Sequence, residues 1–137
     1  MSAYTFTPGG GAPPVPVVPG DVSYFLNLGA LVQSTLRVVP ARVFSMLCEN
    51  TTGPAKYFQL HNVAAPIVLG AVPTVTIRVP ASSVVVVGAD FFGAALPAAP
   101  LLGGLPFSVG LVWAWSTTGA TFTAAPVATQ FTSITFV

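Results

Sequence analysis

Proline or glycine interrupts this chain every few residues, and that feature limits which secondary structures can form. The 137 residues include 14 prolines and 13 glycines, and the segments between them are rich in valine, threonine and aromatic residues. No segment sustains the 3.6-residue apolar period of a helix, whereas short β-branched runs between turn residues are typical of strands. We therefore predict strands over 22–28, 34–39, 41–50, 55–63, 73–79, 83–88, 106–116, 119–124 and 129–136. Strands of this number and spacing favour an all-β fold, a jelly-roll-like antiparallel β-sandwich.

The residue pattern within these strands predicts which faces are buried. Residues 74–80 (TVTIRVP) alternate between apolar and polar, so this strand should have one face of each kind. Residues 107–116 (FSVGLVWAWS) predict one face of large apolar residues, formed by Phe107, Val109, Leu111, Trp113 and Trp115. Residues 84–87 (VVVV) are apolar on both faces, which predicts either an interior strand or a strand covered by a second subunit.

The loops carry further predictions. Residues 49–56 (ENTTGPAK) predict a hairpin loop in which Gly53 takes a positive φ and Pro54 ends the turn. The long apolar loop 89–105 suggests contact with a partner, with Leu101 and Leu102 as candidate contact residues.

Residues 1–20 (MSAYTFTPGGGAPPVPVVPG) differ from the rest of the chain. Their prolines and glycines exclude a helix and a regular sheet, and 13–19 favour extended polyproline II. We therefore divide the chain into an extended N-terminal arm, 1–20, and a β-sandwich domain, 21–137. We expect the arm to lie across a neighbouring subunit, with Tyr4 and Phe6 as anchors.

The chain has few charges: four basic and three acidic residues, with no charged residue after Asp90. A folded monomer of 14.0 kDa would expose roughly 6,700 Å², and a surface of that size with so few charges favours self-association. We expect an oligomer within a larger assembly. The net charge of +1 gives no reason to expect nucleic-acid binding. We also expect no membrane span and no signal peptide, and the lone Cys48 fits synthesis in a reducing cytoplasm.

The candidate chemical groups point away from an enzyme. His61 is the only histidine, the three carboxylates are scattered, and no serine lies in a nucleophile-elbow motif. One histidine and one cysteine fall short of a metal site. We therefore predict no catalytic, cofactor-binding or metal-binding residues. In residues 55–62 (AKYFQLHN), Phe58 and Leu60 should point into the core. Tyr57, Gln59 and His61 should share the opposite, polar face and are candidate partner contacts.

Three segments in order resemble a group of small tailed-phage virion proteins. Residues 56–62 (KYFQLHN) are similar to a strand of the R-Y-L-Q-L-x-N type. Residues 73–81 (PTVTIRVPA) are similar to a P-V-x-x-I-x-V-P-A strand, and 107–118 (FSVGLVWAWSTT) to an F-S-x-G-L-x-x-A-x-S-T-T strand. The resemblance covers roughly residues 36–124, whereas the Pro/Gly-rich arm and the apolar 89–105 loop depart from it.

The resemblance implies a β-sandwich protein without enzymatic activity. It implies a capsid decoration (cement) protein on the phage head surface, forming a homotrimer and binding the major capsid protein. Two alternatives remain open at this point. One is a phage structural protein associated with the tail, neck or fibre. The other is a carbohydrate-binding adhesin module that uses exposed Trp113 and Trp115 rings.

Overall fold

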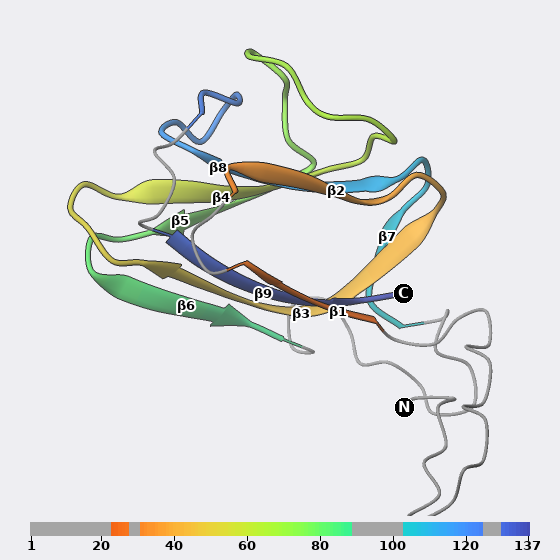
Figure 1. The fold of residues 1–137 in the computed structure, drawn as a ribbon, viewed down its shortest axis with the longest axis horizontal. Helices are drawn as coiled ribbons and strands as arrows, with labels where there is room; N and C mark the ends of the chain where they lie inside the picture. Colours follow the sequence, from red (N-terminus) through yellow and green to blue (C-terminus); the bar gives the residue numbers. More distant parts are fainter. Residues whose placement is uncertain (1–22, 28–30, 89–102, 125–129) are drawn as a thin grey trace, which may run out of the picture.

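A computed structural model describes residues 23–27, 31–88, 103–124 and 130–137. Every regular element among them is a strand, and the strands form two antiparallel sheets that stack face to face (Figure 1). Sheet A contains β1 (Ser23–Asn27), β9 (Gln130–Phe136), β3 (Ala41–Asn50) and β6 (Ser83–Val87) in that order, with the short β7 (Leu105–Phe107) also paired to β3. Sheet B contains β2 (Gln33–Arg37), β8 (Leu111–Ser116), β4 (Lys56–His61) and β5 (Val75–Val79) in that order.

The strand order is that of a jelly roll. From β1 to β4 the chain alternates between the two sheets, β4 and β5 are neighbours in sheet B, and the chain then returns to sheet A at β6. The strand that comes last in the chain in each sheet lies between two earlier strands. Strand β9 pairs with β1 and β3, and β8 pairs with β2 and β4. Apart from β7, the result is two sheets of four strands, which confirms the predicted all-β, jelly-roll-like sandwich.

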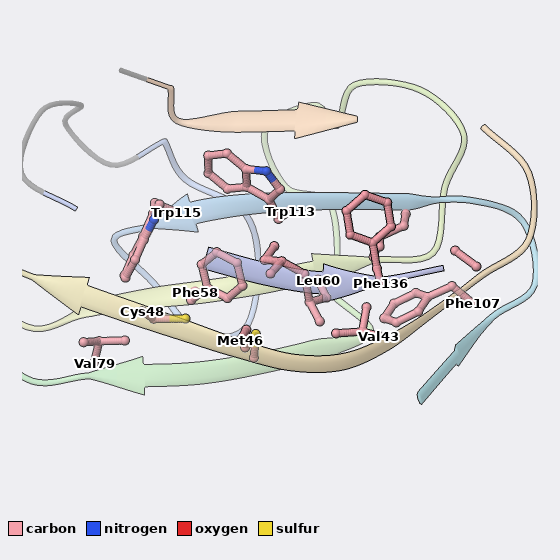
Figure 2. Packing of buried hydrophobic residues seen from close by; sticks show 13 residues of the cluster. Val43, Met46, Cys48, Phe58, Leu60, Val79, Phe107, Trp113, Trp115 and Phe136 are labelled. Carbon is pink, nitrogen blue, oxygen red and sulfur yellow. The ribbon is translucent and has the colours of Figure 1, made fainter. Parts of the chain in front are cut away.

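The core lies between the sheets and is built by alternation along each strand (Figure 2). Phe58 and Leu60 of β4 are fully buried there, as predicted, and Trp113 and Trp115 of β8 pack against Phe58. Cys48 lies in the same cluster, and burial raises the pKa of its thiol far above the ordinary value. Strand β5 also follows its sequence pattern: apolar residues at 75, 77 and 79 face the core, and the polar residues between them are exposed.

The predicted hairpin at 49–56 is wrong. Strand β3 belongs to sheet A and β4 to sheet B, so residues 51–55 carry the chain across the sandwich. Gly53 does not take a positive φ. The turn is held instead by the buried Asn50 side chain, whose Nδ2 donates to the carbonyl oxygens of Pro54 (2.9 Å) and Pro80 (3.3 Å). The Asn50 side-chain amide, and not a glycine with a positive φ, therefore stabilises this turn.

The predicted strand 106–116 is two strands in different sheets. Strand β7 pairs with β3, and β8 pairs with β2 and β4, so the chain changes sheets at 108–110. Gly110 permits this crossing because a Cβ atom there would lie 2.5 Å from the Val63 carbonyl oxygen and 2.7 Å from that of Arg37. Val109 consequently leaves the core face and is exposed.

One further strand prediction is wrong: residues 119–124 form a turn that contributes only an isolated bridge between Ser116 and Ala124. Residues 84–87 were predicted to be either an interior strand or a strand covered by a second subunit. The structure excludes the first alternative, because β6 is an edge strand of sheet A. Cover by a second subunit stays a prediction. The N-terminal arm, 1–20, lies outside the described residues.

Candidate functional site: the outer faces of the two sheets

The polar residues of β4 lie on the outer face of sheet B, as predicted, but loops of the same chain cover two of them. The side chains of Gln59 and His61 are 0% and 1% exposed, whereas Tyr57 is half-buried. The covering loops are the β4–β5 loop, 62–74, and the turn 117–124, which both rise above sheet B in Figure 1. They are joined by backbone hydrogen bonds from Gly70 N to Phe122 O (2.9 Å) and from Phe122 N to Ala71 O (2.8 Å).

Gln59 fixes the second of these loops to the sheet. Its Nε2 donates to the carbonyl oxygens of Thr118 (3.0 Å) and Thr121 (3.2 Å). Its Oε1 lies 3.1 Å from His61 Nε2. Where this turn packs on the sheet its carbonyl oxygens need donors, and the Gln59 amide supplies them from β4.

His61 is a packed residue. Its ring makes an edge contact with Phe122, at 6.4 Å between centroids, and it also hydrogen bonds to the backbone of Val72. Burial lowers the pKa of the imidazole, and the Val72 hydrogen bond opposes that shift. His61 therefore joins β4 to both loops through contacts with the Gln59 amide, the Phe122 ring and the Val72 backbone.

A small apolar layer completes the cover over sheet B. Ile67 and Phe122 from the loops pack on Val112 and Ala114 of β8. The side chain of Gln33 accepts from Ile67 N (2.9 Å) and donates to Ile67 O (3.2 Å), which holds the first loop over β2. Gln59 and His61 could contact another subunit only if these loops moved, so the prediction that they are partner contacts is wrong for this structure. Of the three predicted contacts on β4, only Tyr57 has accessible area.

The outer face of sheet A is different, because the described loops leave β1, β9, β6 and the 45–49 part of β3 uncovered. Inter-strand register places Leu26, Ser133, Leu47 and Val86 in one row across all four strands. Tyr24 lies on the same face, where Ser133 Oγ donates to its hydroxyl (2.9 Å). The large apolar side chains on this face are substantially exposed: Tyr24 64%, Leu26 51%, Leu47 38%, Val84 51% and Val86 70%.

Charge is sparse on this face. The remaining outward positions include Ser45, Phe131 and Thr135. Two charged residues of β3 also point outward, Glu49 and Arg42, and Arg42 Nη1 donates to the carbonyl oxygens of Gly103 and Gly104 at 3.3 Å. Contiguous apolar surface of this kind on a soluble domain marks an interaction site. We define the "open face" as the outward residues of β1, β9, β3 and β6, and take it as the candidate functional site.

The open-face residues are not among the predicted contact residues. Of this face, the sequence indicated possible cover by a second subunit only for 84–87, because that run is apolar on both faces. Tyr24, Leu26 and Leu47 could have been found from the alternation of their strands, which places apolar residues at outward positions. The predicted contacts Tyr4, Phe6, Leu101 and Leu102 lie outside the described residues.

The described residues offer no metal centre and contradict the predicted sugar platform. They contain no group of three or more His, Cys, Asp or Glu residues that could hold a metal ion. The rings of Trp113 and Trp115 are fully buried between the sheets, so they cannot form an exposed platform. None of the described segments is a helix long and apolar enough to cross a bilayer.

No protein-family model, curated protein or solved structure matches this chain.

Proposed function

We propose that this chain is a non-enzymatic structural subunit of a phage virion, a decoration protein that binds the assembled head shell. The observation that carries the proposal is the open face, a sheet surface that the described loops leave uncovered around Leu26, Leu47 and Val86, with only two charged residues, Arg42 and Glu49. Two further observations support the proposal. The fold is a jelly roll, an architecture that viral capsid and lectin domains use. Residues 36–124 also resemble small virion proteins.

The proposed action is mechanical. The open face buries apolar area against the capsid surface or a neighbouring subunit, and the major capsid protein is the proposed partner. An oligomer of such subunits, which the family resemblance implies to be a trimer, contacts several capsid proteins at once. Linked weak contacts then give strong attachment, because each later contact forms within one complex.

The small number of charges gives this attachment a distinctive dependence on salt. Coulombic contacts weaken as ionic strength rises, whereas burial of apolar surface does not. Attachment through the open face should therefore change little between low and moderate salt. A steep loss of head binding over that range would contradict an apolar interface.

The deciding experiment locates and counts the chain on particles of the phage that encodes it. Electron cryomicroscopy of intact virions should show it on the outside of the head, and quantitative mass spectrometry should give hundreds of copies per particle. A few to tens of copies at the tail or neck would instead support a tail-associated role. Absence from purified particles would refute a virion function.

A matched pair of variants tests the surface itself. Leu26→Lys places a charge on the open face, and Val68→Lys places the same charge at an exposed position of the loop over sheet B. We expect Leu26→Lys to weaken binding to undecorated heads by about tenfold or more, since a lysine must be desolvated at an apolar contact. Val68→Lys should bind like the wild type. Equal loss in both variants would argue against the open face as the contact.

A further inference from the structure

The four edge strands of the sandwich differ in how they are protected from pairing with other chains. Sheet B ends at β2 and β5, and each of these strands carries one arginine, Arg37 and Arg78. Sheet A ends at β1 and β6, and neither strand contains a charge or a proline. Charged residues and prolines on edge strands normally prevent unwanted strand pairing. Sheet A therefore lacks the protection that sheet B has.

Of the two unprotected edges, β6 is the more open. At β1, the guanidinium of Arg37 reaches across from sheet B, and its Nη2 donates to Ser23 Oγ at 3.0 Å. At β6, the strand pairs with β3 on one side, and no described strand pairs with the other side. Its neighbour across the sandwich, β5, directs Arg78 to the outer face of sheet B, away from sheet A.

The side chains of β6 fit a second strand of the same sequence. Val85 and Val87 point inward and pack against the core, while Val84 and Val86 point outward on the open face. An antiparallel pair centred on Val85 would set Val84 of each copy opposite Val86 of the other. Directly opposed β-branched residues are favourable cross-strand pairs. This register overlaps all five residues, Ser83–Val87, and brings no charged side chain into the strand pair.

We propose that β6 pairs antiparallel with β6 of a second copy of this chain about a two-fold axis. The two A sheets then form one continuous sheet, and four outward valines make an apolar cluster at its centre, beside Leu47 of each copy. A free strand edge offers backbone donors and acceptors in a row, and the partner that satisfies such a row is another strand. Self-pairing through one patch gives a closed dimer.

The contact is short, which sets its strength. A five-residue strand pair buries less than the roughly 800 Å² per partner of a standard interface. We therefore expect a weak, concentration-dependent dimer in dilute solution. The inference does not depend on the proposed virion function, because it concerns the chain alone. It predicts even-numbered assemblies, whereas the resemblance to virion proteins implies a trimer.

Sedimentation over a wide concentration range tests the contact. The wild-type mass should move from that of the 14.0 kDa chain toward even multiples of it. The double variant Val84→Lys/Val86→Lys should raise the dimer Kd by at least about tenfold, because like charges would face each other across the dyad. Both positions are exposed in the single chain, so an unchanged circular dichroism spectrum and melting temperature at low concentration should show that the variant folds.

The matched control is Val68→Lys/Val72→Lys, which makes the same two changes at positions 74% and 75% exposed on the loop over sheet B. This control should associate like the wild type. The proposal is overturned by a wild-type mass that stays monomeric or becomes trimeric without even-numbered species. It is also overturned if the β6 variant associates like the wild type, or if the control loses association to the same extent.

Cysteine cross-linking tests the register. An oxidised mixture of Val84→Cys and Val86→Cys proteins should give more linked dimer than either protein alone, since only the mixture places the new thiols directly opposite each other. The native Cys48 does not interfere because it is fully buried. Equal yields in the three samples would overturn a pair centred on Val85.

Discussion

Replacing Gln59 by leucine should destabilise the protein even though the new side chain is apolar and enters a buried site. Leucine has nearly the volume of glutamine, so the substitution removes hydrogen bonds without opening a large cavity. Four polar contacts disappear: those of Nε2 with the Thr118, Gly119 and Thr121 carbonyl oxygens, and that of Oε1 with His61 Nε2.

These contacts do not cost the same to remove. The Thr121 carbonyl keeps two other donors, Thr118 Oγ1 (2.8 Å) and Ser116 Oγ (3.1 Å), and the Gly119 carbonyl keeps Thr76 Oγ1 (2.9 Å). Thr118 is an exposed residue, so water can replace the lost donor at its carbonyl. The His61 side chain is buried, and a buried polar group left without a partner costs about 1–3 kcal/mol, so we expect a loss of about 1–3 kcal/mol in the free energy of unfolding. For a domain of this size that corresponds to a fall of roughly 4–12 °C in Tm.

The control is Thr76→Ala, which removes an exposed hydrogen bond to the same turn, from Thr76 Oγ1 to Gly119 O at 2.9 Å. Water replaces an exposed partner, so this change should cost no more than about 0.5 kcal/mol. Urea unfolding of the three proteins, followed by circular dichroism at one fixed protein concentration, gives the comparison. A loss below about 1 kcal/mol for Gln59→Leu, or equal losses in both variants, would refute the role assigned to Gln59.

Two further predictions concern buried polar groups. Trp115→Phe should lower the free energy of unfolding by at least about 1 kcal/mol more than Trp113→Phe does. Both indoles are fully buried, but Trp115 Nε1 donates to the buried Thr132 hydroxyl at 2.8 Å, whereas Trp113 Nε1 has no partner among the described residues; equal midpoints in urea for the two variants would contradict this. The free energy of unfolding should fall as the pH decreases from about 7 to 5, because burial holds the pKa of His61 below its ordinary value near 6.5 and the unfolded chain then takes up more protons. His61→Gln should flatten this part of a urea-midpoint profile against pH, and an unchanged slope would show that another group is responsible.

The sequence was informative where a strand's own residues decide its faces. The alternation at 74–80 and the inward placement of Phe58 and Leu60 were predicted correctly, because side chains on a strand point to opposite sheet faces whichever strands pair with it. The prediction of a jelly-roll-like sandwich succeeded for the related reason that many short, interrupted strands leave few other ways to bury their apolar faces.

Most of the failures in strand assignment concern long-range pairing. Residues 49–56 look like a hairpin because a turn lies between two strands, and nothing local reveals that β3 and β4 belong to different sheets. Residues 106–116 look like one strand because the crossing at Gly110 depends on the carbonyl oxygens of Arg37 and Val63, which are distant in sequence. Sequence pattern also could not show that β6 ends its sheet, since an apolar run fits an interior strand equally well.

The polar residues of β4 were predicted to be partner contacts, but they bind loops of the same chain. Gln59 and His61 suggested a contact surface because polar side chains usually lie on the outside of a domain. A loop packed on a sheet also needs hydrogen-bond donors and acceptors for its own backbone, and these two residues meet that need. Among the described residues, the outer surface that no loop of the chain covers is the apolar one, around Tyr24, Leu26, Leu47 and Val86 of the open face. In a chain with so few charges, polar side chains such as Gln59 and His61 bind the subunit's own loops, and the open face is left as the proposed contact surface.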